Sequence, residues 1–150
     1  MGFVTLEEII KFAVQREEDA VQLYTRAAEM TASIAARKMF EEFVAEETGH
    51  KKVFSQMDLA KAEQYKANKV PDMGISKYLV HLELKPDMSY PQILQFAIKT
   101  EENAYQLYKA AAEAVDDPQL KKTLEVFADV ELGHKKRIEA IYDEKVLTEN

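Results

Sequence analysis

The stretch of sequence that decides the fold occurs twice: residues 16–24 read REEDAVQLY, and residues 100–108 read TEENAYQLY. The match extends over residues 5–52 and 89–136, and 20 of the 48 aligned positions are identical. A second shared stretch, ETGHKK at residues 47–52, recurs as ELGHKK at residues 131–136. The chain is therefore a duplicated unit, and a reading of one half can be checked against the other.

Each unit is predicted to form two helices joined by a short connection. Thr5 with Glu8 three residues later is a capping box, and Ser89 followed by Pro91 is typical of a helix start. Asp117 before Pro118 indicates a further start. Short connections favour antiparallel hairpins. We predict helices over about residues 5–30, 33–59, 89–115 and 118–144, which form the hairpins 5–59 and 89–144.

A long crossover, residues 60–88, separates the two hairpins. It contains Pro71, Gly74 and Pro86, and residues 80–84 alternate apolar and polar side chains, so part of it is predicted to be extended. A crossover of this length can return the chain along the whole bundle. The predicted fold class is all-α, a single domain over residues 1–150 in which two duplicated helical hairpins form a four-helix bundle.

Composition excludes several classes of function. The net charge is −7 and the pI about 5.1, so nucleic acid is not an expected partner. The chain has no cysteine, which excludes disulfides, thiol catalysis and cysteine-held iron–sulfur centres. It has no long apolar run and no signal-peptide pattern near Met1, so we expect no membrane association and a cytoplasmic location.

Each unit carries two adjacent glutamates, and only the first of each pair faces the core. Positions three, four and seven residues apart share a helix face. Those around Glu17 are almost all apolar: Ile10, Ala13, Val14, Ala20, Val21 and Tyr24. Those around Glu18 are largely polar: Lys11, Gln15, Gln22 and Thr25 with Val14 and Val21. The second unit repeats the contrast, so Glu17 and Glu101 are predicted to point inward, whereas Glu18 and Glu102 face solvent.

The second helix of each unit adds a glutamate and a histidine. Glu47 shares its face with Phe40, Phe43, Val44 and Phe54, and Glu131 shares its face with Leu124, Phe127, Ala128 and Ile138. His50 and His134 each follow their glutamate by one helical turn, so both side chains of a pair can reach one point. Glu46 is not a predicted ligand, because its counterpart in the second unit is Val130.

Four carboxylates on core faces require positive charge, because an isolated buried carboxylate costs several kcal/mol. We expect no lysine or arginine on the inner faces of the first and third helices. Two divalent cations would balance four carboxylates, and oxygen with imidazole ligands suits iron, manganese or zinc. The predicted ligands of a two-metal site are Glu17, Glu47, His50, Glu101, Glu131 and His134.

Three further features of the sequence lie outside the predicted ligand set. Tyr24 and Tyr108 follow Glu17 and Glu101 by two turns, so they are either core aromatics or hydrogen-bond donors to a ligand carboxylate. Gly49 and Gly133 are predicted to allow close helix packing near the site. His81 lies in the crossover and is predicted to be a surface residue.

As a set, these motifs resemble the ferritin-like superfamily, and most closely its rubrerythrin-type di-iron domain, over residues 5–143. The resemblance implies that Glu17 and Glu101 are ligands, that Glu47 and Glu131 bridge or chelate, and that His50 and His134 each bind one iron. Two departures stand out. There is no cysteine for a rubredoxin-like domain, and Ala104 stands where many members carry an extra glutamate.

The resemblance implies a non-haem di-iron oxidoreductase that reduces peroxide or dioxygen, in defence against oxidative stress. An external electron-donor protein would have to re-reduce it. The alternatives are a ferroxidase or iron-storage protein and a structural or partner-binding bundle with a vestigial site. Neither hairpin can bury its apolar stripe alone, and the crossover is long. We therefore expect a homodimer, in which helix pairs could be exchanged between chains.

Overall fold

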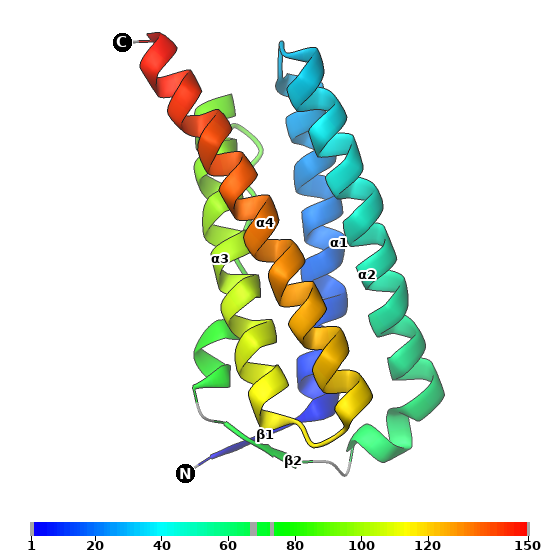
Figure 1. Ribbon diagram of the computed structural model, residues 1–150. Helices are drawn as coiled ribbons and strands as arrows, with labels where there is room; N and C mark the ends of the chain where they lie inside the picture. The colour runs from blue at the N-terminus through cyan, green and yellow to red at the C-terminus, as the bar shows by residue number, and fades with distance from the viewer. Residues whose placement is uncertain (1, 67–68, 73, 150) are drawn as a thin grey trace.

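Four long helices form two antiparallel hairpins that pack side by side in the computed structural model (Figure 1). The structure describes residues 2–66, 69–72 and 74–149. The first hairpin consists of α1 (Leu6–Met30) and α2 (Ile34–Lys66), and the second of α3 (Tyr90–Ala114) and α4 (Pro118–Glu149). The predicted fold class is confirmed, although α2 and α4 extend beyond their predicted ends.

Local capping groups fix the starts of the helices. The Thr5 hydroxyl accepts a hydrogen bond from the Glu8 amide, and Ser89 forms a reciprocal capping box with Gln92. Ser33 accepts from the Ala36 amide at the start of α2, and Asp117 accepts from the Gln119 amide at the start of α4. These bonds satisfy amide groups that have no partner within the helix, at about 1 kcal/mol each.

The crossover returns the chain along the bundle, so α2 and α3 run parallel (Figure 1). It begins later than residue 60, because α2 continues to Lys66. Strand β2 (Lys69–Pro71) pairs antiparallel with β1 (Phe3–Thr5), and a short 3-10 helix, η1 (Ile75–Tyr78), follows. Residues 80–84 form no strand. Leu82 and Leu84 are half-buried there, whereas Val80, His81 and Glu83 are exposed.

The apolar core is split into two clusters along the bundle axis. One cluster contains Ala13, Phe54, Ala104 and Ala128, and the other contains Ala20, Phe43, Ala97 and Ile138. In every helix, the predicted inward-facing glutamate lies between its members of the two clusters. A layer of charged side chains therefore crosses the middle of the core. None of the helices in the described residues is long and apolar enough to cross a membrane.

Candidate metal centre

Each helix contributes one glutamate to the charged layer. Glu17 on α1, Glu47 on α2, Glu101 on α3 and Glu131 on α4 are all 0% exposed. Their neighbours on the outer faces behave differently. Glu18 accepts a hydrogen bond from Lys51 at 2.8 Å, and Glu102 lies 3.6 Å from Lys135, both at the surface. The two faces are therefore arranged as the sequence predicts.

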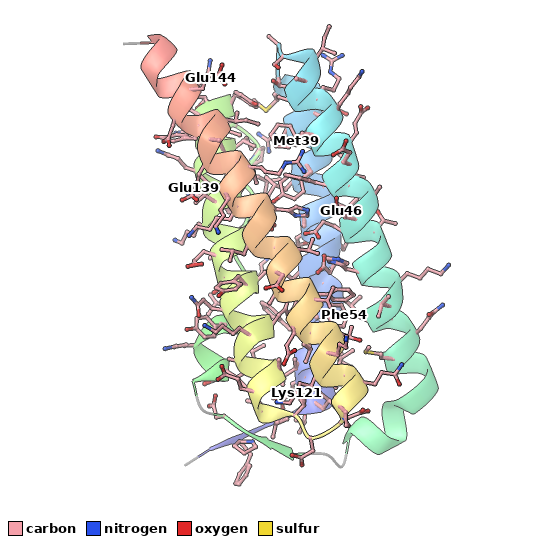
Figure 2. The ribbon with its side chains drawn as sticks, in the orientation of Figure 1. Met39, Glu46, Phe54, Lys121, Glu139 and Glu144 are labelled. Carbon is pink, nitrogen blue, oxygen red and sulfur yellow. The ribbon has the colours of Figure 1, made fainter. Side chains whose placement is uncertain are left out.

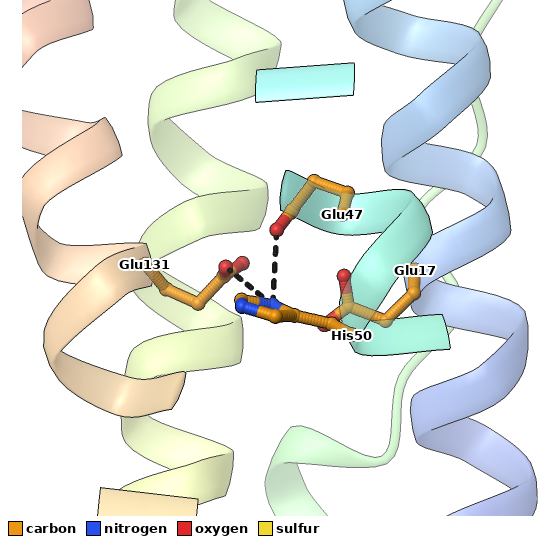
Figure 3. A group of neighbouring side chains, drawn as sticks. All are labelled: Glu17, Glu47, His50 and Glu131. Atoms are coloured by element: carbon orange, nitrogen blue, oxygen red, sulfur yellow. Dashed lines mark ion pairs between the residues drawn. The ribbon is translucent and has the colours of Figure 1, made fainter. Parts of the chain in front are cut away.

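His50 points its Nδ1 atom into the glutamate cluster. This atom lies 3.2 Å from Glu47 Oε1, 3.5 Å from Glu17 Oε1 and 3.6 Å from Glu131 Oε1. Figure 3 shows the four side chains converging from α1, α2 and α4. The spacing of His50 three residues after Glu47 brings both to this point, because residues one turn apart share a helix face.

His134 occupies the matching position in the second hairpin. Its Nδ1 atom lies 3.4 Å from Glu101 Oε2, 3.9 Å from Glu131 Oε1 and 4.0 Å from Glu47 Oε1. The imidazole nitrogens that could ligate a metal therefore both face the cluster. Each histidine contacts both cluster glutamates of its own hairpin and one cluster glutamate of the opposite hairpin.

The six residues form two overlapping groups of candidate ligands. One group consists of Glu17, Glu47, His50 and Glu131, and the other of Glu47, Glu101, Glu131 and His134. Within each group, one ligand atom from every residue lies within 4.8 Å of the others. Glu47 and Glu131 belong to both groups, which is the arrangement expected of two carboxylates shared by two metal ions. The structure brings the predicted residues together, and their role as ligands stays a prediction.

The chemistry of these atoms fits bound cations. Several buried oxygen and nitrogen atoms of the cluster have no hydrogen-bond partner among the described residues: Glu47 Oε1, Glu101 Oε2, Glu131 Oε1, and Nδ1 of His50 and His134. Buried polar atoms without partners are rare, because each costs about 1–3 kcal/mol. Coordination to two metal ions would satisfy them.

Arg16 corrects the expectation that the inner faces lack a basic residue. Its side chain is 8% exposed, and its guanidinium reaches all four glutamates. It donates to Glu47 at 2.7 Å and lies 3.3 Å from Glu17. It also contacts Glu101 and Glu131. The sequence did carry a signal, since the helical neighbours of Arg16 are mostly apolar: Ile9, Phe12, Ala13, Ala20 and Leu23.

Burial and Arg16 set the proton affinities of the cluster. Burial raises the pKa of Glu131 well above its usual value, and burial with the Glu47 charge raises the pKa of Glu17. Burial alone would also raise the pKa of Glu47, but Arg16, His50 and the other neighbours together outweigh it and lower that pKa. Burial disfavours a charged His50, yet contacts with Glu17 and Glu47 outweigh it and raise its pKa to about 9.

The two tyrosines differ in how well they match the predicted role of hydrogen-bond donor to a ligand carboxylate. Tyr108 on α3 donates from its hydroxyl to Glu17 Oε1 on α1 at 2.7 Å. Tyr24 on α1 is also fully buried, and burial together with the nearby Glu101 charge raises its pKa. Each tyrosine thus approaches the glutamate of the opposite hairpin, and only Tyr108 donates a well-formed hydrogen bond to it. Both also belong to the core clusters.

Each histidine ring stacks against a phenylalanine of the other hairpin. Phe43 on α2 stacks on His134 with a centroid separation of 3.9 Å, and Phe127 on α4 stacks on His50 at the same separation. Phe43 and Phe127 occupy equivalent positions in the two repeats. The stacked rings fix the orientation of the imidazoles and exclude water from their faces.

Glu46 was not a predicted ligand, but it contacts one. Its Oε2 atom lies 2.8 Å from Nε2 of His134, on the side of the ring away from the cluster. Figure 2 labels Glu46 on α2, between Met39 and Phe54. A carboxylate on the outer nitrogen of a ligating histidine fixes its orientation and raises its basicity. Helix-face analysis gave no signal for this pair, because it joins two helices.

Two minor expectations have different outcomes. A Cβ atom added at Gly49 or Gly133 would meet nothing within 4 Å outside its own helix turn, so the predicted close packing at these glycines is wrong. His81 is exposed, as predicted, and its Nδ1 atom lies 3.3 Å from Asp19.

Comparisons with known proteins agree with this arrangement. Residues 3–58 and 92–150 match the family model for rubrerythrin, so the match covers both hairpins. The chain also resembles a Thermotoga maritima protein whose crystal structure is named as a ferritin-like diiron-carboxylate protein. The TM-score is 0.74 at 20% identity, over 97% of this chain and 99% of that one. At this identity the likeness shows the ferritin-like fold. Among curated proteins, none matches significantly.

Proposed function

The chain belongs to the rubrerythrin family, and from this premise we propose that it is a di-iron carboxylate oxidoreductase that reduces hydrogen peroxide or dioxygen. The observation that carries the proposal is the pair of overlapping ligand groups that share Glu47 and Glu131. Glu17 with His50 completes one metal position, and Glu101 with His134 completes the other. Four carboxylates and two divalent ions are together neutral.

Two iron ions bound here would supply Lewis acidity and two electrons for the reduction of the oxidant. The chain supplies a dry, rigid pocket for them. All four glutamates are fully buried, and Phe43 and Phe127 cover the histidine rings. The Tyr108 hydroxyl keeps its proton directed at Glu17 Oε1, which holds that carboxylate in one orientation. Manganese or zinc would suit the same ligands, but zinc has no redox chemistry.

The electron donor is proposed to be a separate protein. The chain has no cysteine with which to hold a rubredoxin-like centre of its own. We further propose a homodimer, with exchange of helix pairs as one form of it, and a cytoplasmic location. One chain's four helices bring the complete ligand set together. Dimer formation therefore adds stability or a donor-binding surface rather than missing ligands.

A second candidate function is a structural or partner-binding bundle with a vestigial site. Arg16 favours it, because this guanidinium already contacts all four glutamates and supplies positive charge without a metal. A protein of this kind would retain its fold and remain metal-free when purified.

Anaerobic loading with Fe(II), followed by metal analysis and titration with hydrogen peroxide, separates these functions. The proposed oxidoreductase binds two irons per chain and consumes one hydrogen peroxide per di-iron centre, which the change in absorbance during the titration measures. It then requires a reductant before it can react again. A ferroxidase or storage protein continues to take up iron beyond two per chain. A vestigial site binds no iron tightly. Loading of two irons with no reaction toward peroxide or dioxygen would refute the oxidoreductase.

A further inference from the structure

Arg16 and a pair of metal ions would compete for the same four carboxylates. Its Nη1 atom donates to Glu47 Oε2 and contacts Glu17 and Glu131, and its Nη2 atom contacts Glu101. The guanidinium thus engages one oxygen of every glutamate. A positive charge at this point also repels divalent ions. The oxygens that face the histidines, such as Glu47 Oε1 and Glu101 Oε2, are left without a hydrogen-bond partner among the described residues. Two added cations beside the Arg16 charge would therefore favour its displacement.

The structure provides a place for Arg16 to go. A pocket of about 470 Å³ lies between α1, α3 and crossover residues 80–84, and Arg16 forms part of its wall. The side chain therefore borders the glutamate cluster and this pocket at the same time. Asp19 and Glu83 also line the pocket and offer carboxylates to a displaced guanidinium. Their opposite charge would compensate for the contacts that it loses.

The repeat shows that this position does not require a cation. The residue equivalent to Arg16 in the second unit is Thr100, which lines the same pocket. Its hydroxyl donates to Ala97 O of its own helix at 3.0 Å. The duplicated site therefore combines one arginine and one small side chain on the facing helices α1 and α3. The small side chain leaves space where the arginine would otherwise meet its counterpart.

We propose that Arg16 is an internal cation that competes with metal ions for the four glutamates and moves into the pocket beneath residues 80–84 when they bind. This inference rests on the proposed metal site. Arg16 is a positioning residue that lowers metal affinity and stabilises the metal-free bundle. It gives the chain a folded metal-free state despite four buried carboxylates, and the chain then exchanges one cation for two.

The test measures Fe(II) affinity anaerobically against a competing chelator, and thermal stability in the metal-free state. The variant Arg16→Thr introduces the residue of the second repeat. Lys11→Thr is the control, because it removes one positive charge from an exposed site on the same helix. We expect Arg16→Thr to bind Fe(II) about tenfold or more tightly, since a like charge a few ångströms away has an effect of that size. We also expect its metal-free melting temperature to fall.

Val80→Trp tests the movement itself, because Val80 is 48% exposed and lines the pocket. Filling the pocket should weaken Fe(II) binding in the presence of Arg16 and leave it unchanged in Arg16→Thr. This arm also holds if metal-free Arg16→Thr does not fold, since the variant can be prepared with metal. Equal affinities of wild type and folded Arg16→Thr for two ions would overturn the competition and leave the proposed function standing. If neither protein binds two ions, the proposed function fails and the competition fails with it.

Discussion

The two hairpins provide the same ligands and surround them differently. Glu17, Glu47 and His50 in the first hairpin correspond to Glu101, Glu131 and His134 in the second. The supporting residues differ: Arg16 corresponds to Thr100, and Glu46 corresponds to Val130. The two repeats therefore share the proposed ligands and the phenylalanines that cover the histidines, but differ at Arg16 and Glu46. We therefore expect the two proposed metal positions to have similar ligands but to differ in affinity and in proton coupling.

The largest expected effect separates shared from unshared ligands. Glu131→Gln removes a carboxylate that belongs to both ligand groups, whereas Glu17→Gln removes one that belongs to a single group. We expect Glu131→Gln to lose both metal ions and Glu17→Gln to keep one, measured by metal analysis after Fe(II) loading and desalting. Glu18→Gln and Glu102→Gln are the controls and should keep two. Equal losses in all four variants would mean that the face assignment is wrong.

The effect of pH should have opposite signs with and without metal. The pKa of His50 is about 9 in the folded metal-free chain, above its ordinary value of 6.5. Its contribution to stability is therefore complete below about pH 6.5 and is lost as the pH rises through about 9. The raised pKa values of Glu17 and Glu131 act in the same direction. Metal binding requires deprotonated ligands, so Fe(II) affinity should rise over this range.

Thermal melts of the chelated protein between pH 6 and 9 test this expectation. The melting temperature should fall with pH, and the fall should be smaller in His50→Gln. Burial lowers and the Glu101 contacts raise the pKa of His134, with a net rise, so some slope should remain. A melting temperature that rises steadily from pH 6.5 to 9 would show that the metal-free cluster is not arranged as described.

The two histidines differ in the residue that lies behind the ring. Glu46 lies 2.8 Å from His134, whereas the equivalent position beside the first hairpin's histidine is Val130. We expect Glu46→Ala to weaken one of the two metal positions by about 10–100-fold, which is usual for loss of a carboxylate behind a ligating histidine. Val130→Ala should leave both positions within a few-fold of wild type. Stepwise Fe(II) titration distinguishes the two, and similar isotherms for both variants would remove Glu46 from the site.

The smallest effect should distinguish the tyrosines. Tyr108→Phe leaves Glu17 Oε1 without its 2.7 Å donor, while Tyr24→Phe removes a hydroxyl with no well-formed hydrogen bond. Loss of a bond to a buried charged group costs about 1–3 kcal/mol. We therefore expect the larger loss of unfolding free energy in Tyr108→Phe, measured by denaturant titration of the metal-free protein. Equal losses would assign both tyrosines to simple core packing.

The sequence predicted the bundle and its inward-facing glutamates because both depend on helical periodicity within one segment. The repeat added a second copy of each pattern, which distinguished Glu17 from Glu18. Glu46 escaped prediction because its contact with His134 joins residues 88 positions apart on different helices. Arg16 escaped for another reason. Its apolar neighbours indicated burial, but an arginine is almost never fully buried unless it is paired, so the residue type favoured a surface position.

The crossover shows a second limit of sequence reasoning. Residues 80–84 alternate apolar and polar side chains, yet no strand forms there and Val80 is exposed. The segment is held by side chains instead. Arg26 donates to Lys85 O at 2.7 Å and also to Pro86 O, and Asn103 donates to Tyr78 O at 2.9 Å. Such contacts depend on how α1 and α3 pack against the crossover, which local patterns do not specify.

The central claim is that four buried glutamates and two histidines hold two metal ions within one bundle. The most direct test is the number of iron ions per chain after anaerobic Fe(II) loading and removal of excess metal, measured by elemental analysis on protein whose helicity is checked by circular dichroism. We expect two ions per chain. One ion or fewer on a fully helical wild-type protein would contradict it.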